Sequence, residues 1–322
     1  MQRVLEYQQL IAKKIEELHL PKEPANLYDP LKYFLKLGGK RTRPTLTLLG
    51  CELFGKPGTE AINAAIAVEL FHNFTLIHDD IMDEAPLRRG QKTVHSKWDL
   101  NIGILSGDVL FVEAYKFLSK HDSAVLPDLL DVFSKTAVEV CEGQQLDMDF
   151  ENRTDVSIEE YINMIRLKTS VLLGAALKMG GIIGQAKEED LTHLYNFGVN
   201  VGIAFQLKDD LLDLYADPDK FGKQVGGDII ANKKTFLLLK AQELATGINA
   251  EILKNTLKET DNKVKVAKSK EFFSSLSIDQ LTKDKMDEYY LKAKEHLKAI
   301  DVDDKAKENL LQLGEYLMNR EE

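Results

Sequence analysis

The chain has little cysteine and little proline. Its 322 residues include only 2 cysteines and 8 prolines. Cys51 and Cys141 lie far apart and form no Cys-x-x-Cys pair, so no disulfide framework is indicated and we expect both to be small buried side chains in a reducing compartment. The prolines fall mostly between periodic segments, which leaves room for long helices.

Long hydrophobic runs are also missing. The most apolar stretch, residues 170–184, is interrupted by Lys178 and by four glycines, so no transmembrane segment is expected. Residues 1–6 lack the apolar core of a signal peptide, and we expect a cytoplasmic protein.

The chain has fewer basic than acidic residues. The chain has 42 Lys and Arg against 52 Asp and Glu, a formal net charge of −10. Binding to nucleic acid depends mostly on neutralising phosphates with Lys and Arg, so a general nucleic-acid binder is disfavoured. An anionic ligand would have to meet a local basic patch or a bound metal.

The chain does have helical periodicity. Apolar residues recur at three- and four-residue spacing almost throughout, which predicts an all-α fold, a large helical bundle around a central cavity. Helices are expected near residues 2–18, 28–37, 43–54, 59–83, 93–119, 124–150, 157–184, 189–215 and 232–245. No linker is apparent, so we predict a single domain over residues 1–322. Residues 61–77 and 169–183 are apolar on nearly all sides, which is typical of helices at the centre of a bundle.

Two copies of the pattern Asp-Asp-x-x-Asp follow apolar helical stretches, at residues 79–83 and 209–213. Carboxylates at i and i+4 lie close together and repel, and the C-terminal end of a helix disfavours negative charge further. Carboxylate ligands completed by water and phosphate are typical of magnesium rather than of zinc or a calcium cage. A single copy would more often be a solvated helix end, but the duplication favours magnesium bridging the protein to a polyphosphate, with both motifs opening onto one cavity.

A basic turn lies near the N-terminus. Residues 38–44 read Gly-Gly-Lys-Arg-Thr-Arg-Pro, which sets three cations beside two glycines before a helix. Glycines let a backbone approach a ligand closely, and a helix start binds anions. Alone, the turn would be a solvated charge run, and it is not a Walker A loop because Arg41 stands where Ser or Thr is required. Together with Arg88 and Arg89, just past the first aspartate motif, it indicates a second phosphate site.

These residues resemble the trans-isoprenyl diphosphate synthases, the polyprenyl synthetase family of prenyltransferases. The ordered motifs that carry the resemblance are residues 38–44, His72 with 79–83, 87–90, 143–147, Lys168 with Thr169, Phe205 with Gln206 and 209–213, and 222–235. The last carries Asn232 where relatives often have glycine, and it lacks a proline soon after Thr235. The resemblance implies an isoprenoid synthase-like bundle, a homodimer, and condensation of isopentenyl diphosphate with an allylic diphosphate, releasing pyrophosphate.

The resemblance also implies roles for single residues. Three magnesium ions on the allylic diphosphate would be held by Asp79, Asp80, Asp83 and Asp209, with Asp210 and Asp213 in support. The same diphosphate would be contacted by Arg88, Lys168, Lys223 and Lys233. The isopentenyl diphosphate headgroup would be bound by Lys40, Arg43, His72 and Arg89, and the reacting carbons would be lined by Thr169 and Gln206. By residue type alone, His72 would be a core histidine and Thr169 a helical hydroxyl bonded to its own backbone.

Product length is predicted from the helix that precedes the first motif. Helical spacing sets Asp79 above the small Thr75, and Thr75 above Phe71, about 12 Å below Asp79 at 1.5 Å per residue. Phe74 adds a partial wall one step round the helix. Within the family this pattern resembles geranylgeranyl diphosphate synthases, with farnesyl diphosphate as the near alternative.

Two further alternatives stay open. A class I terpene cyclase also ionises an allylic diphosphate with magnesium, but it needs no second diphosphate pocket, and the motifs at 38–44 and 87–90 speak against it. In an inactive regulatory subunit we would expect some aspartates of the two motifs to be replaced, whereas both motifs are intact here.

Overall fold

The computed structural model describes residues 1–216 and 225–319, and its helices confirm the all-α prediction. The strands in these ranges are β1 (Leu87–Arg88) and β2 (Gln91–Lys92), an antiparallel hairpin in which Leu87 pairs with Lys92. None of the helices described is both long and apolar enough to cross a membrane.

The chain divides into two compact units. Unit 1 comprises residues 1–134, 175–194 and 301–310, and unit 2 comprises residues 135–174, 195–300 and 311–322. Each unit contains one of the two aspartate motifs. The single domain over residues 1–322 stays a prediction.

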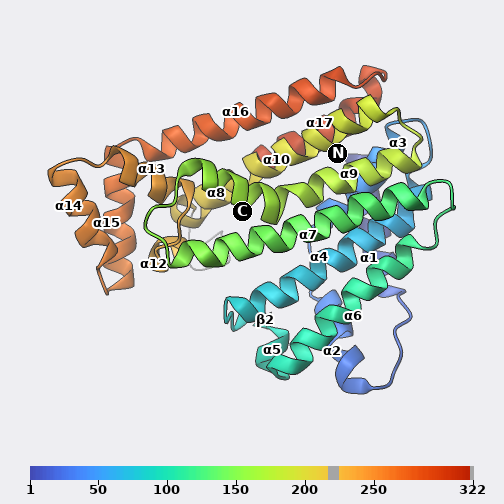
Figure 1. The fold of residues 1–322 in the computed structure, drawn as a ribbon, viewed down its shortest axis with the longest axis horizontal. Coiled ribbons are helices and arrows are strands. Elements are labelled where there is room, and N and C mark those ends of the chain that lie inside the picture. Colours follow the sequence, from blue (N-terminus) through green and yellow to red (C-terminus); the bar gives the residue numbers. More distant parts are fainter. Residues whose placement is uncertain (217–224, 320–322) are drawn as a thin grey trace. The chain divides into compact units, whose positions relative to one another are not determined.

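Unit 1 is built largely on two long helices that pack against each other. It contains α1 (Gln2–Glu16), α2 (Ala25–Lys36), α3 (Thr42–Glu52), η1 (Gly58–Ala61), α4 (Ile62–Met82), α5 (Val94–Lys97) and α6 (Leu100–Leu118). Helices α4 and α6 run side by side (Figure 1). Their close packing depends on Gly107, where a Cβ atom would collide with the His78 ring. As predicted, α4 is buried on nearly all sides along residues 64–71.

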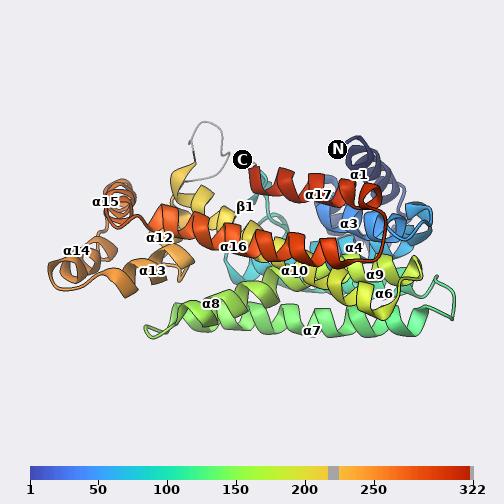
Figure 2. The ribbon, with the colours of Figure 1, turned by 90° about the horizontal axis from the view of Figure 1, so that it is seen from above.

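Unit 2 contains most of the helices of the C-terminal half. The helices that lie wholly within it are α8 (Ile158–Ile165), η2 (Arg166–Ser170), α12 (Gly227–Ile230), α13 (Phe236–Leu244), α14 (Ile248–Leu257), α15 (Asn262–Ser275) and α16 (Ile278–Ala299). Helices α7 (Leu126–Glu151), α9 (Val171–Ile183), α10 (Glu188–Tyr215) and α17 (Asp304–Asn319) contribute residues to both units. Helices α13, α14 and α15 lie together beside one end of α16 (Figure 2). A core that includes Leu211, Leu237 and Phe273 joins α10 to these helices.

A π-helical turn, η2, interrupts the helix predicted over residues 157–184. The helix begins with a capping box, because Ser157 accepts a hydrogen bond from the Glu160 amide and the Glu160 side chain accepts one from the Ser157 amide. The turn passes so close to α7 that a Cβ atom at Gly143 would collide with the Lys168 backbone. Gly143 therefore lets η2 approach α7 beside Asp147.

Two sequence predictions need correction. The helix expected over residues 93–119 is split between α5 and α6 near Trp98, because Asp99 caps α6 by accepting a hydrogen bond from the Ile102 amide at 2.8 Å. Cys51 is buried as expected, but Cys141 is exposed, because it lies on the face of α7 that also carries the exposed Val138.

Candidate active site

The first aspartate motif occupies the C-terminal end of α4. Asp79 and Asp80 lie in the last turn and Asp83 caps the helix. Asp80 is only 1% exposed, and Arg88 on β1 donates from Nε to both of its carboxylate oxygens at 2.8 Å. Burial raises the pKa of Asp80, and Arg88 only partly opposes that rise. The structure thus brings together two residues predicted to act on the same diphosphate.

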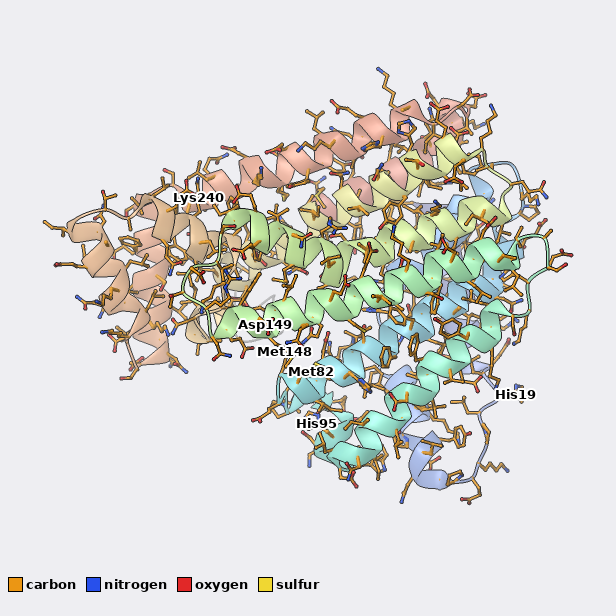
Figure 3. All side chains as sticks on the ribbon, viewed as in Figure 1. His19, Met82, His95, Met148, Asp149 and Lys240 are labelled. Atoms are coloured by element: carbon orange, nitrogen blue, oxygen red, sulfur yellow. The ribbon has the colours of Figure 1, made fainter. Side chains whose placement is uncertain are left out.

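The surroundings of this helix end are open. Met82 at the end of α4 is exposed, and it is labelled in Figure 3 together with His95 on the adjacent helix α5. Asp83 is exposed as well. A ligand can therefore reach this end of α4 from solvent.

The basic turn and α4 bring two predicted headgroup residues together. Arg43 Nη1 lies 3.2 Å from His72 Nε2. Burial lowers the pKa of Arg43 to about 10 and lowers that of His72 well below its usual value, with Arg43 adding to the effect on His72. The buried Arg43 Nε has no hydrogen-bond partner among the described residues. A buried cation with an unused donor beside a neutral imidazole is suited to an anion.

Arg89 completes this basic group. Its guanidinium donates a hydrogen bond to the Gly38 carbonyl. Gly39 has a positive φ of 139°, and a Cβ atom there would collide with the Arg89 guanidinium, so glycine is required. Lys40 is exposed and its carbonyl accepts a hydrogen bond from Gln8 Nε2 at 2.8 Å.

Arg41 has a structural role that the sequence pattern did not reveal. It adopts a left-handed conformation, φ 47°, and its buried guanidinium pairs with the buried Glu69 and donates to the Leu35 carbonyl at 3.0 Å. Of the three cations in the basic turn, this one is directed into the protein core.

The second aspartate motif lies in the last turns of α10. Asp210 is buried and accepts hydrogen bonds from Tyr161 Oη on α8 and from Gln206 Nε2, the latter at 3.3 Å. Thr169 Oγ1 in turn donates to Gln206 Oε1 at 3.2 Å. The predicted Thr169, Gln206 and Asp210 are thus joined in one hydrogen-bonded chain. Tyr161 was missed, because nothing in its sequence context distinguishes it from a core tyrosine.

The positive charge near Asp210 does not offset its burial, since Lys233 lowers its pKa less than burial raises it. Burial raises the pKa of its carboxyl to about 7, Asp228 raises it further, and the hydrogen bonds from Tyr161 and Gln206 only partly oppose this. A cation beside Asp210 would stabilise the ionised carboxylate. The residues present therefore fit a metal bound by oxygen ligands, although no group of three or more His, Cys, Asp or Glu side chains within residues 1–216 and 225–319 is preassembled to hold one.

Asp213 contacts the N-terminal end of α12. Its Oδ2 accepts a hydrogen bond from the Asp228 amide at 3.1 Å. Its carbonyl accepts one from the Gly226 amide at 2.6 Å. Lys223, one of the predicted diphosphate contacts, lies outside the described residues.

A carboxylate on α7 holds two of the predicted lysines. Asp147 Oδ2 lies 2.6 Å from Lys168 Nζ and 3.2 Å from Lys233 Nζ. Burial raises the pKa of Asp147, but the two ammonium groups outweigh it and keep the carboxyl below its usual pKa. Asp147 belongs to the motif at residues 143–147. Apart from its place in that motif, nothing in the sequence indicated that it binds the two lysines.

The predicted floor beneath the first motif is an aromatic cluster. Phe71 lies 5.6 Å from Phe74 and 5.3 Å from Phe133, measured between ring centroids. Phe111 on α6 stacks on Phe74 at 5.0 Å, a contact that the sequence did not predict because it depends on how α4 and α6 pack. Thr75 Oγ1 donates to the His72 carbonyl at 2.8 Å, so its hydroxyl group is paired within α4.

Known proteins resemble this chain over most of its length. The family model described as "Polyprenyl synthetase" matches residues 24–274. The chain is 41% identical, over 97% of its length and 96% of the relative's, to a protein of Geoglobus acetivorans named geranylgeranyl pyrophosphate synthase. It is 40% identical to the geranylgeranyl diphosphate synthase of Methanosarcina mazei, covering 95% of this chain and 94% of that one.

A solved structure titled as a geranylgeranyl pyrophosphate synthase has a TM-score of 0.94 and 46% identity, with 98% of each chain covered. The family model, the relatives of similar length and the solved structure all indicate the same family. The chain therefore belongs to the polyprenyl synthetase family of prenyltransferases.

Proposed function

We propose that this chain is a geranylgeranyl diphosphate synthase, which condenses isopentenyl diphosphate with an allylic diphosphate and releases pyrophosphate. The observation that carries the proposal is the nearly full-length similarity to proteins of that name, combined with an aromatic cluster beneath the first aspartate motif.

The aspartates are proposed as magnesium ligands. Asp79, Asp80, Asp83 and Asp209, with Asp210 and Asp213 in support, would hold three ions on the allylic diphosphate, and those ions would stabilise the charge of the leaving pyrophosphate. The raised pKa of Asp210 supports a cation near that motif.

The basic residues are proposed to bind the same diphosphate. Arg88, Lys168, Lys223 and Lys233 would contact its oxygens as the carbon–oxygen bond breaks and its electron pair moves to pyrophosphate. Asp147 supports this role because it fixes the ammonium groups of Lys168 and Lys233 within 3.2 Å of one oxygen. Positioned cations need no reorganisation when the leaving group gains charge.

The second substrate would use the basic turn. Lys40, Arg43, His72 and Arg89 would hold the isopentenyl diphosphate headgroup, so that its double bond is presented to the allylic cation. The double bond supplies the electron pair of the new carbon–carbon bond, and a proton is then lost to the released pyrophosphate. Thr169 and Gln206 would line the reacting carbons, and the apolar surroundings would exclude water from the cation.

Product length would be limited by the aromatic cluster. The buried Phe71, together with Phe74 and Phe111, forms a wall that the growing chain would meet beyond Thr75. Farnesyl diphosphate, the shorter product, remains the nearest alternative.

The active form is proposed to be a homodimer in the cytoplasm. Helix α6 exposes Leu105 and Val112, at 57% and 59%, on one side seven residues apart. Two exposed aliphatic side chains two helical turns apart form a surface that pairing with a second copy would bury.

The proposal is tested by incubating the protein with magnesium, isopentenyl diphosphate and, separately, dimethylallyl, geranyl or farnesyl diphosphate, followed by chromatographic sizing. We expect a C20 product from each primer. A C15 product from geranyl diphosphate that is not extended would favour a farnesyl diphosphate synthase. A hydrocarbon formed from geranylgeranyl diphosphate alone would favour a terpene cyclase, and no turnover would favour a regulatory subunit.

A further inference from the structure

Unit 2 contains a cavity of about 410 Å³. Its walls come from the α7–α8 connection at Thr154, the turn at Asn232 and Lys234, and helices α13 and α14. The volume lies in the range of small-molecule sites.

The cavity wall is basic. Lys234, Lys254 and Lys258 line it, and none of the other described lining residues is acidic. Lys254 and Lys258 are four residues apart at the end of α14, where like charges repel, and neither forms a salt bridge within residues 1–216 and 225–319. Lys234 Nζ donates to the Glu151 carbonyl at 3.2 Å. Such a group of cations is suited to an anionic ligand.

A partly buried asparagine lies on the same wall. Asn232 Oδ1 is shielded from solvent and has no hydrogen-bond partner among the described residues. An unsatisfied buried polar atom destabilises a fold, and Asn232 is one of the residues that line the cavity. Either the oxygen or the amino group of the side-chain amide can occupy this position, because rotating the amide by half a turn exchanges the two. Asn232 and the three lysines thus line one cavity.

The rest of the lining is apolar. Leu238 and Leu253 are buried beneath the cavity, and Leu257 and Ala245 continue that surface. An ion such as free phosphate would leave this apolar surface exposed to water, whereas a hydrocarbon chain would bury it.

We propose that this cavity binds a phosphate or diphosphate monoester that carries a short hydrocarbon chain. Its oxygens contact Lys234, Lys254 and Lys258, and its chain lies on the leucines of α13 and α14. Asn232 and Lys234 flank Lys233, whose ammonium lies 3.2 Å from Asp147. The cavity thus adjoins, along the chain, a residue of the site proposed above.

The binding claim is tested without turnover, so that it stands or fails apart from the proposed function. Geranyl monophosphate is titrated calorimetrically into the full-length protein in EDTA. Two variants change the cavity, Lys254→Gln with Lys258→Gln to remove charge and Ala250→Phe to fill the space. Lys263→Gln with Lys305→Gln removes the same charge from exposed positions outside the cavity.

We expect both cavity variants to bind about tenfold more weakly than the wild type, and the control variant to bind like the wild type. Equal affinity in the wild type and both cavity variants, or no binding to the wild type, would overturn the proposal. Inorganic phosphate and geraniol are titrated as separate probes. If inorganic phosphate binds as tightly as geranyl monophosphate, the hydrocarbon part of the proposal is wrong.

Discussion

The Phe74 ring on α4 lies flat against the Phe111 ring on α6, with centroids 5.0 Å apart and planes inclined by 9°. Phe71 contacts both rings, at 5.6 Å and 5.4 Å. Phe133 on α7 also packs on Phe71, at 5.3 Å, so the wall beneath the first aspartate motif is made by three helices, and removing one ring leaves the others in place.

We predict that Phe71→Ala together with Phe74→Ala lengthens the product beyond C20, and that adding Phe111→Ala lengthens it further. Each substitution removes a ring that blocks the hydrocarbon chain. The measurement is chromatographic sizing of products from farnesyl and isopentenyl diphosphates. Phe54→Ala, which removes an aromatic ring outside this cluster, is the control and should leave product length unchanged. An unchanged product in the triple variant would refute the wall.

We predict that Asp147→Asn lowers kcat/KM by about 10- to 100-fold, a loss of about 1.4–2.7 kcal/mol of transition-state stabilisation. The neutral amide no longer holds Lys168 and Lys233 at one oxygen. Steady-state pyrophosphate release measures the effect. Asp149→Asn, on the exposed end of the same helix, should retain nearly full activity, and equal losses in the two variants would contradict the role of Asp147.

We predict a pH dependence of stability from Asp210. Its ordinary pKa of 3.8 applies to the unfolded chain, whereas burial holds the folded value near 7. Between these values the folded state binds the extra proton, so the free energy of unfolding falls as pH rises, by roughly 2–4 kcal/mol in total.

Urea unfolding in EDTA at pH 4.5 to 8 measures this fall. Asp210→Asn carries no titrating proton, so the stability of this variant should fall less with pH than that of the wild type. Asp284→Asn, at an exposed position, should follow the wild type. Parallel curves for the wild type and Asp210→Asn would show that the carboxyl does not titrate in this range.

The buried pair of Arg41 and Glu69 yields a prediction about stability. Arg41→Met should lower the free energy of unfolding by about 3–5 kcal/mol, because it leaves the Glu69 carboxylate buried without its partner. Changing Glu69→Leu as well should recover part of that loss. Denaturant unfolding measures both, and a double variant less stable than the single one would contradict this explanation.

Helix α6 carries the prediction about assembly. Leu105→Glu with Val112→Glu should give a monomer by light scattering, because charges on this exposed apolar face would oppose pairing. Ile248→Glu is the control, since Ile248 is 76% exposed on α14. A dimer that survives the changes on α6, or a wild type that is monomeric, would exclude this surface.

The sequence predicted most of the helices and the ends at which the aspartate motifs lie, because apolar periodicity and helix length are local properties. It did not predict the break at Trp98, where a single cap at Asp99 overrides a continuous apolar pattern. It also missed Tyr161, Phe111 and the pairing of Arg41 with Glu69. Each of these depends on which helices pack together, and residue type alone does not reveal that.

The most direct test of the central claim is pyrophosphate release from farnesyl diphosphate, measured with and without isopentenyl diphosphate in the presence of magnesium. We predict release that requires both isopentenyl diphosphate and magnesium, that accompanies formation of a C20 diphosphate, and that falls sharply in Asp80→Asn and Asp209→Asn. Release that is equally fast without isopentenyl diphosphate, or that persists in both aspartate variants, would contradict the account.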